Sequence, residues 1–147
     1  MTSVVVEDVG PALRCTVRLP GCTTERALEA FTSPEVLARW WYGELTVDLV
    51  PGGAYIVWFP VPKARMNGEV IRYLPGEALE FTWAWDHEPD ARPRTVVVTA
   101  SNAPDDVVLL TIEHAPHSDD EAGVAARADH RAGWEHFLPR LPDAMTG

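Results

Sequence analysis

The pattern that most limits the fold of this chain is a series of three predicted β-hairpins. Each hairpin consists of two stretches in which apolar and polar side chains alternate, joined by a turn rich in glycine, proline, asparagine or aspartate. The predicted strands cover residues 44–50 and 54–59, 68–74 and 78–85, and 95–100 and 107–114. Tight turns connect antiparallel strands, because parallel strands need a long crossover. The sequence therefore predicts an antiparallel sheet.

Another strand and two short helices precede the hairpins. Residues 12–19 alternate, with Leu13, Cys15, Val17 and Leu19 on one side. Thr23 or Thr24 can cap a helix over residues 25–31. Ser33 followed by Pro34 then begins a second helix, which ends at Trp40 and Trp41.

The last predicted element is a long helix over residues 120–141. It carries apolar side chains at helical spacing, namely Trp134, Phe137, Leu138 and Leu141. Pro139 falls inside this pattern and is expected to disturb the final turn. The prolines in residues 60–67 and 86–94 predict loops there, and the acidic stretch from His117 to Glu121 is expected to be mobile.

These elements predict an α+β fold in which a curved antiparallel sheet of about seven strands wraps around the C-terminal helix, a helix-grip fold. At 147 residues, the length is that of one domain. We therefore expect a single domain over residues 1–147, with its core at about 12–141.

Charge and composition exclude several classes of protein. Twelve basic and 22 acidic residues give a net charge of −10, which argues against nucleic acid or an anionic membrane as partner. No signal peptide or membrane-spanning run is expected. The two cysteines, Cys15 and Cys22, form neither a metal-type pair nor a disulfide framework. A cytoplasmic location is the expectation.

Several segments resemble the START-like (SRPBCC) superfamily, and within it the branch of homologues of the activator of heat-shock-protein-90 ATPase. The resemblance rests on residues 24–35, the Trp40-Trp41 pair, residues 51–55, 68–71, 79–83 and 130–134, with Leu138 and Leu141. It covers about residues 13–141 and implies a helix-grip fold with a cavity between sheet and terminal helix. Such cavities commonly take apolar small molecules, but the resemblance implies no single reaction.

The parity of the strands places many aromatic side chains on one face of the sheet, opposite the terminal helix. Each of these rings taken alone can simply fill the core. Together with Trp134, however, the large rings pack poorly into a seamless core, and buried tryptophan and tyrosine each need a polar partner, which favours a pocket. The predicted ligand-binding residues are Trp40, Tyr55, Val57, Glu69, Ile71, Tyr73, Phe81, Trp83, Trp134 and Leu138.

Glu69 is the most specific of these residues. In the predicted register its carboxylate points into an apolar cavity, where burial would raise its pKa and suit it to acid–base chemistry or ligand anchoring. The alternative is a buried ion pair with Arg127 or Arg131 of the helix. A register error of one residue would instead expose Glu69.

The histidines offer a second candidate site. His114 and His117, followed by Asp119, Asp120 and Glu121, have the residue types of a metal site. We favour a solvated loop, and accordingly expect no metal and no cofactor. His130 can face either the cavity or solvent. Motifs for phosphate binding, nucleophilic catalysis or zinc proteolysis are absent from the sequence.

Gly133 lies in the interior of the predicted terminal helix, where glycine costs about 1 kcal/mol relative to alanine. The residue therefore predicts a close approach between helix and sheet. On this basis Gly133→Leu should destabilise the fold.

Three functional hypotheses follow. The first is a small domain that binds an apolar or aromatic small molecule. The second is a cyclase- or hydratase-like enzyme that uses Glu69 or a cavity histidine as acid–base group. The third is activation of a chaperone ATPase, which the expected single domain favours less, because co-chaperone activators of this type carry a second module. A homodimer is compatible with any of these.

Overall fold

The computed structural model describes residues 4–61, 63–88 and 92–145. Its centre is one eight-stranded antiparallel sheet with the order β1-β2-β8-β7-β6-β5-β4-β3. The strands are β1 (Val4–Val9), β2 (Ala12–Pro20), β3 (Glu44–Val47), β4 (Ala54–Phe59), β5 (Ala64–Leu74), β6 (Ala78–Trp85), β7 (Arg94–Ala103) and β8 (Val107–Ala115). The helices are α1 (Thr24–Thr32), α2 (Pro34–Trp40), α3 (Glu121–Phe137), the 3-10 turn η1 (Leu138–Arg140) and α4 (Leu141–Ala144).

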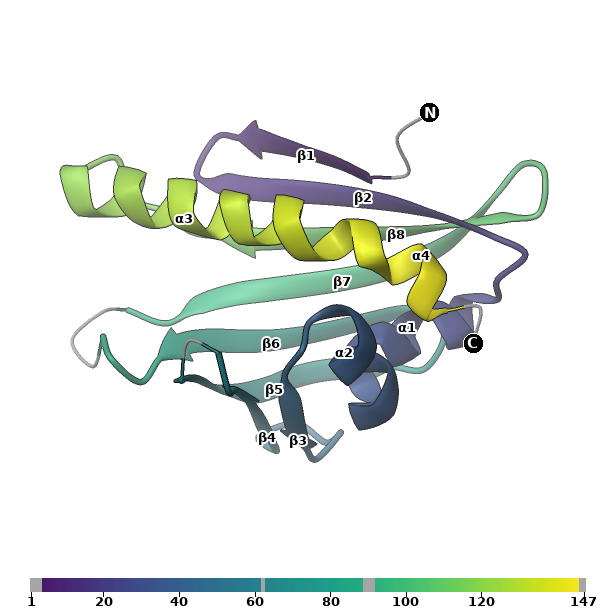
Figure 1. The fold of residues 1–147 in the computed structure, drawn as a ribbon, viewed down its shortest axis with the longest axis horizontal. Helices are drawn as coiled ribbons and strands as arrows, with labels where there is room; N and C mark the ends of the chain where they lie inside the picture. Colours follow the sequence, from purple (N-terminus) through teal and green to yellow (C-terminus); the bar gives the residue numbers. More distant parts are fainter. Residues whose placement is uncertain (1–3, 62, 89–91, 146–147) are drawn as a thin grey trace.

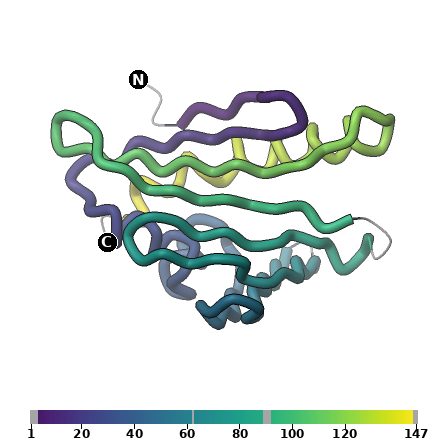
Figure 2. The backbone as a smooth tube through the Cα atoms, turned by 180° about the vertical axis from the view of Figure 1, so that it is seen from behind, coloured from purple at the N-terminus to yellow at the C-terminus, as the bar shows by residue number. Residues whose placement is uncertain are grey.

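All of these helices lie on one side of the sheet. In Figure 1, α3 runs along β2 and β8, and α1 and α2 lie near the end of the sheet where the chain terminates. Seen from behind in Figure 2, the strands lie in front of the helices. This arrangement confirms the predicted helix-grip fold. Among the described residues no helix is long and apolar enough to cross a membrane.

The predicted helix starts are confirmed. The Thr23 side chain accepts a hydrogen bond from the backbone N–H of Arg26, and Ser33 accepts one from Val36. Both bonds satisfy N–H groups that the first helical turn leaves without partners.

Several predicted boundaries are wrong. β1 was not predicted, because only Val4 of this edge strand is fully buried and its sequence does not alternate. β5 begins at Ala64, inside the predicted 60–67 loop, whereas β3 already ends at Val47. At Pro139 the regular helix ends, and the chain continues through η1 and α4.

The helix α3 is tied to the first hairpin through its arginines. Arg131 forms an ion pair with Asp8 at 3.2 Å and donates to the carbonyl of Val6. Arg127 donates to the carbonyl of Gly10. Among the described residues neither arginine forms an ion pair with Glu69, so the alternative ion pair for Glu69 is not formed.

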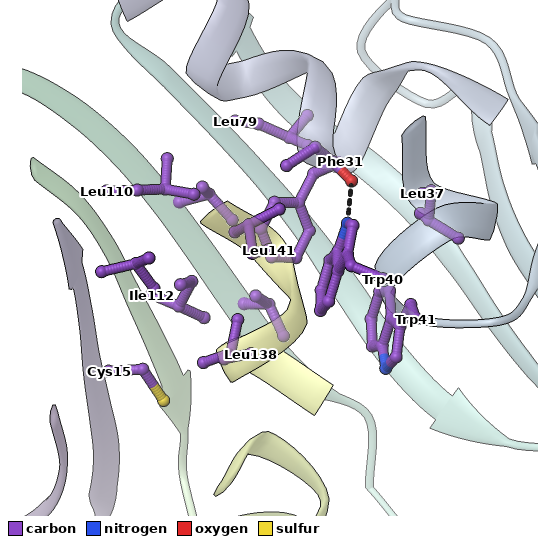
Figure 3. Close-up of a cluster of buried hydrophobic side chains, with 14 of the residues drawn as sticks. Cys15, Phe31, Leu37, Trp40, Trp41, Leu79, Leu110, Ile112, Leu138 and Leu141 are labelled. Atoms are coloured by element: carbon purple, nitrogen blue, oxygen red, sulfur yellow. Dashed lines mark hydrogen bonds between the residues drawn. The ribbon is translucent and has the colours of Figure 1, made fainter. Parts of the chain in front are cut away.

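Apolar side chains from α1, α2, η1 and α4 fill the end of the sheet near α1. Figure 3 shows Trp40 beside Trp41, with Leu138 and Leu141 lying over the sheet residues Leu110 and Ile112. Trp40 donates its indole N–H to the carbonyl of Ala30 at 2.8 Å. These side chains form the hydrophobic core at this end of the sheet.

Candidate functional site

An aromatic cavity of about 130 Å³ lies between α3 and the β4, β5 and β6 side of the sheet. Its lining consists of Trp41, Phe59, Val61, Trp83, Trp85, Asp129, His130, Gly133, Trp134 and Phe137. Val61 is 86% exposed and Asp129 is exposed, so these two residues form the rim. Aromatic rings thus form the walls, and the carboxylate of Asp129 lies at the mouth of the cavity.

Local structure explains why the rings meet. Trp83 follows Leu79 and Phe81 at every second position of β6, which turns its side chain toward the helices. Trp41 caps the end of α2, and its ring lies 5.6 Å from that of Trp83. Trp134 completes the wall from α3, with its ring 5.4 Å from that of Trp41. Three separate elements therefore supply one aromatic site.

Two of the predicted ligand-binding residues, Trp83 and Trp134, line this cavity. Five others, Trp40, Tyr55, Val57, Phe81 and Leu138, are buried in the core away from the lining. Tyr55, for example, stacks on Phe81 with ring centroids 3.9 Å apart and donates its hydroxyl to the carbonyl of Phe31. A polar partner for a buried tyrosine does not require a pocket.

The predicted inward orientation of Glu69 and Ile71 is wrong. Val70 is buried, whereas Glu69 is exposed and Ile71 is 42% exposed. The pairing of β5 with β6 shifts between Val70 and Arg72, which reverses the parity of the strand. Tyr73, beyond this shift, packs against the core as predicted, but it lies outside the cavity lining.

The prediction for Gly133 is also corrected. Gly133 lines the cavity, and apart from its chain neighbours and the backbone of its own helix, no atom of the described residues lies within 4 Å of the place where its Cβ would be. No close contact with the sheet therefore requires glycine here. The missing side chain leaves room for the cavity.

Three histidines from different elements gather beside this cavity. His114 lies on β8, His117 follows it, and His130 lies on α3 and lines the cavity. One nitrogen from each lies within 4.8 Å of the others. His114 and His117 are buried, so the expectation that the segment from His117 is mobile and solvated is wrong for its first residue.

Hydrogen bonds fix the protons of the histidines. The indole of Trp85 donates to Nε2 of His130 at 3.1 Å, so the proton of neutral His130 lies on Nδ1. That Nδ1–H faces Nε2 of His117 at 3.0 Å, and Nδ1 of His117 faces the carbonyl of Pro11 at 3.3 Å. These contacts form one directional chain of donors and acceptors.

His114 is held in the same way by another indole. Trp134 donates to Nδ1 of His114 at 3.2 Å, which leaves the proton on Nε2. That Nε2–H is buried and has no partner among the described residues. Every histidine of the group is thus neutral, with its single lone pair already accepting a hydrogen bond.

This arrangement opposes metal binding, although the residue types suit zinc. A metal ion needs the lone pairs that Trp85, His130 and Trp134 occupy with their N–H groups. Two of these donors are indoles, which cannot reverse a hydrogen bond because they have no acceptor.

The surroundings also keep the histidines uncharged. Burial, followed by the charges of Arg94 and His117, lowers the pKa of His130 from 6.5 to about 3. Burial likewise holds the pKa of His114 well below its ordinary value and lowers that of His117. Within the described residues no hydrogen bond or ion pair joins a carboxylate to these histidines, so protonation would place a poorly compensated charge among apolar rings.

The predicted ligand-binding residues did not include Trp41, Phe59, Trp85 or His130. Parity did put Phe59 and Trp85 on the correct face. The spacing of His130 from His117 carried no signal, since the two meet only through the packing of α3 on the sheet.

Solved structures with similar folds support the architecture. DynU16, from the dynemicin biosynthetic locus, matches with a TM-score of 0.76 and 23% identity over 94% of this chain. This chain spans only 48% of DynU16. A protein from Arthrobacter aurescens matches with a TM-score of 0.78 and 17% identity, covering 99% of this chain and 92% of that one. CalU16 from Micromonospora echinospora matches with a TM-score of 0.72 and 20% identity, covering 99% and 85%.

At these identities the likeness shows the fold alone. No curated protein matches the chain. The family described as "Activator of Hsp90 ATPase homolog 1-like protein" matches residues 22–146, which is most of the sequence. The chain therefore belongs to this family of the SRPBCC superfamily.

Proposed function

We propose that this protein is a small-molecule-binding domain whose ligand places a compact apolar group in the aromatic cavity. The observation that carries the proposal is the open space at Gly133, in front of walls made by Trp41, Trp83 and Trp134. Small-molecule sites are concave and mostly apolar, with a few polar groups. A cavity of about 130 Å³ is close to the 150 Å³ of an engineered apolar cavity that binds benzene.

Binding is better supported than catalysis. Glu69, the acid–base group of the enzymatic hypothesis, lies outside the cavity. His130 does line it, but its lone pair accepts the Trp85 N–H and its low pKa makes it a weak base. The chaperone hypothesis draws only on the description of the family.

A titration with toluene, monitored by tryptophan emission and by calorimetry, tests the proposal. We expect a saturable change for the wild type and none for Gly133→Leu, because the leucine side chain would fill the cavity. Ala128→Leu is the matched control, since it adds a similar side chain at an exposed position of the same helix. Equal binding by Gly133→Leu and the wild type, or no saturable binding of toluene and related ring compounds, would refute the proposal.

A further inference from the structure

The walls of the cavity are ring surfaces set at steep angles to one another. Trp83 and Trp85 are nearly perpendicular, with an interplanar angle of 83° and centroids 5.3 Å apart. Trp41 and Phe59 meet at 70° with centroids 5.5 Å apart. A group inside the cavity therefore meets aromatic rings from several directions.

Two of the indole N–H groups in these walls are already engaged. Trp85 and Trp134 donate theirs to His130 and His114. The Nε1 atom of Trp83 is itself buried. Aromatic rings make up most of the cavity lining, and the faces of such rings carry the negative part of the aromatic quadrupole. The faces of such rings attract cations.

The charges around the cavity also favour a positively charged ligand. Among its described lining residues there is no lysine or arginine, and His130 is neutral. Asp129 at the rim carries the one carboxylate of the lining, and within residues 4–61, 63–88 and 92–145 it has no cationic partner. The net charge of −10 adds a long-range attraction for cations.

From the ring walls and the unpaired carboxylate at their mouth, we propose that the compact group that enters the cavity is an alkylated organic ammonium, quaternary or tertiary, whose apolar alkyl surface meets the rings. This inference rests on the proposed function and names the chemical class of the ligand. The cavity of about 130 Å³ holds one compact head group, and the rest of the molecule extends past Val61 and Asp129. A neutral apolar group would gain from the same walls but not from their charge.

Choline and its uncharged analogue 3,3-dimethylbutan-1-ol provide the test, because they share a shape and differ in charge. We expect choline to bind at least about tenfold more tightly by calorimetry, with a change in tryptophan emission. Asp129→Asn should weaken choline several-fold and leave the alcohol unchanged. This substitution is at an exposed position, so folding is retained. Gly133→Leu should abolish binding of both compounds, whereas Ala128→Leu should bind as the wild type does.

The outcomes separate the two proposals. If the alcohol binds as tightly as choline, or if Asp129→Asn has no effect on choline, the ammonium inference is wrong and the apolar cavity stands. If choline, the alcohol and toluene all fail to bind, both proposals are wrong. Choline binding that survives in Gly133→Leu would also overturn the inference, because the site would lie elsewhere.

Discussion

The neutral histidine group makes the stability of this protein depend on pH above the range in which carboxylates titrate. The pKa of His130 is lowered in the folded protein, so the unfolded chain binds more protons as the pH falls below about 6.5. The stabilisation is therefore present near pH 7 and is lost progressively as the pH falls toward 3. Between pH 7 and pH 5 a shift from 6.5 to about 3 corresponds to a loss of about 2 kcal/mol from His130 alone.

The structure fixes both the sign and the source of this effect. Protonation of His130 requires Nε2 to become a donor, and that atom faces the indole N–H of Trp85. His114 and His117, whose pKa values are also lowered, add to the loss. Arg94 acts on all three histidines as a like charge, while Asp8 partly offsets it at His117.

Urea unfolding at pH 7, 6 and 5 measures this loss directly. We expect the wild type to lose about 2 kcal/mol and the melting temperature to fall by roughly 4–8 °C. His130→Gln should be less stable at pH 7 but lose less between pH 7 and pH 5. His136→Gln, at an exposed histidine of the same helix, should behave as the wild type does. A wild-type stability that stays flat over this range would refute the reasoning, as would an equal loss in His130→Gln.

Three further predictions follow from the contacts. Gly133→Ala should raise stability by up to about 1 kcal/mol, because alanine favours the helix and its Cβ enters open space; thermal unfolding that shows a loss would contradict the open geometry. Tyr55→Phe should cost about 1 kcal/mol in urea unfolding, since it removes the hydrogen bond to the buried carbonyl of Phe31; an unchanged midpoint would count against that bond. Equimolar Zn²⁺ should leave the melting temperature of the wild type at pH 7 unchanged, because the three histidine lone pairs are occupied. A zinc-dependent rise that His117→Ala removes would show that the ion displaces the indole donors.

The limits of prediction from sequence are clearest at β5. Alternation correctly identified a strand ending at Leu74, but it could not reveal the shift between Val70 and Arg72. A bulge adds one residue to a strand and leaves no mark in the alternation of apolar and polar residues. When alternation is continued through the bulge, the residues before it or after it are therefore assigned to the wrong face of the sheet. Glu69 and Ile71 were misplaced for this reason alone.

The cavity itself shows a second limit. Trp40 and Trp41 are adjacent tryptophans at the end of α2, and the sequence pattern alone does not indicate which of the two faces the cavity. The packing of α2 buries the first against Ala30 and turns the second toward Trp83. The same holds for Gly133, where the sequence shows a missing side chain but not whether the space is filled or empty.

Local sequence patterns alone predict β2 to β8, α1, α2 and the long terminal helix in their correct order, because strand alternation, helix caps and turns are set by neighbours a few residues apart. They also predict that aromatic side chains from β6 and the terminal helix face one another. Which of these rings line the cavity and which fill the core follows from how the helices pack on the sheet. The tertiary structure alone brought His130 to His117 and His114, since these residues meet through contacts between distant elements, and such contacts leave no periodic trace in the chain.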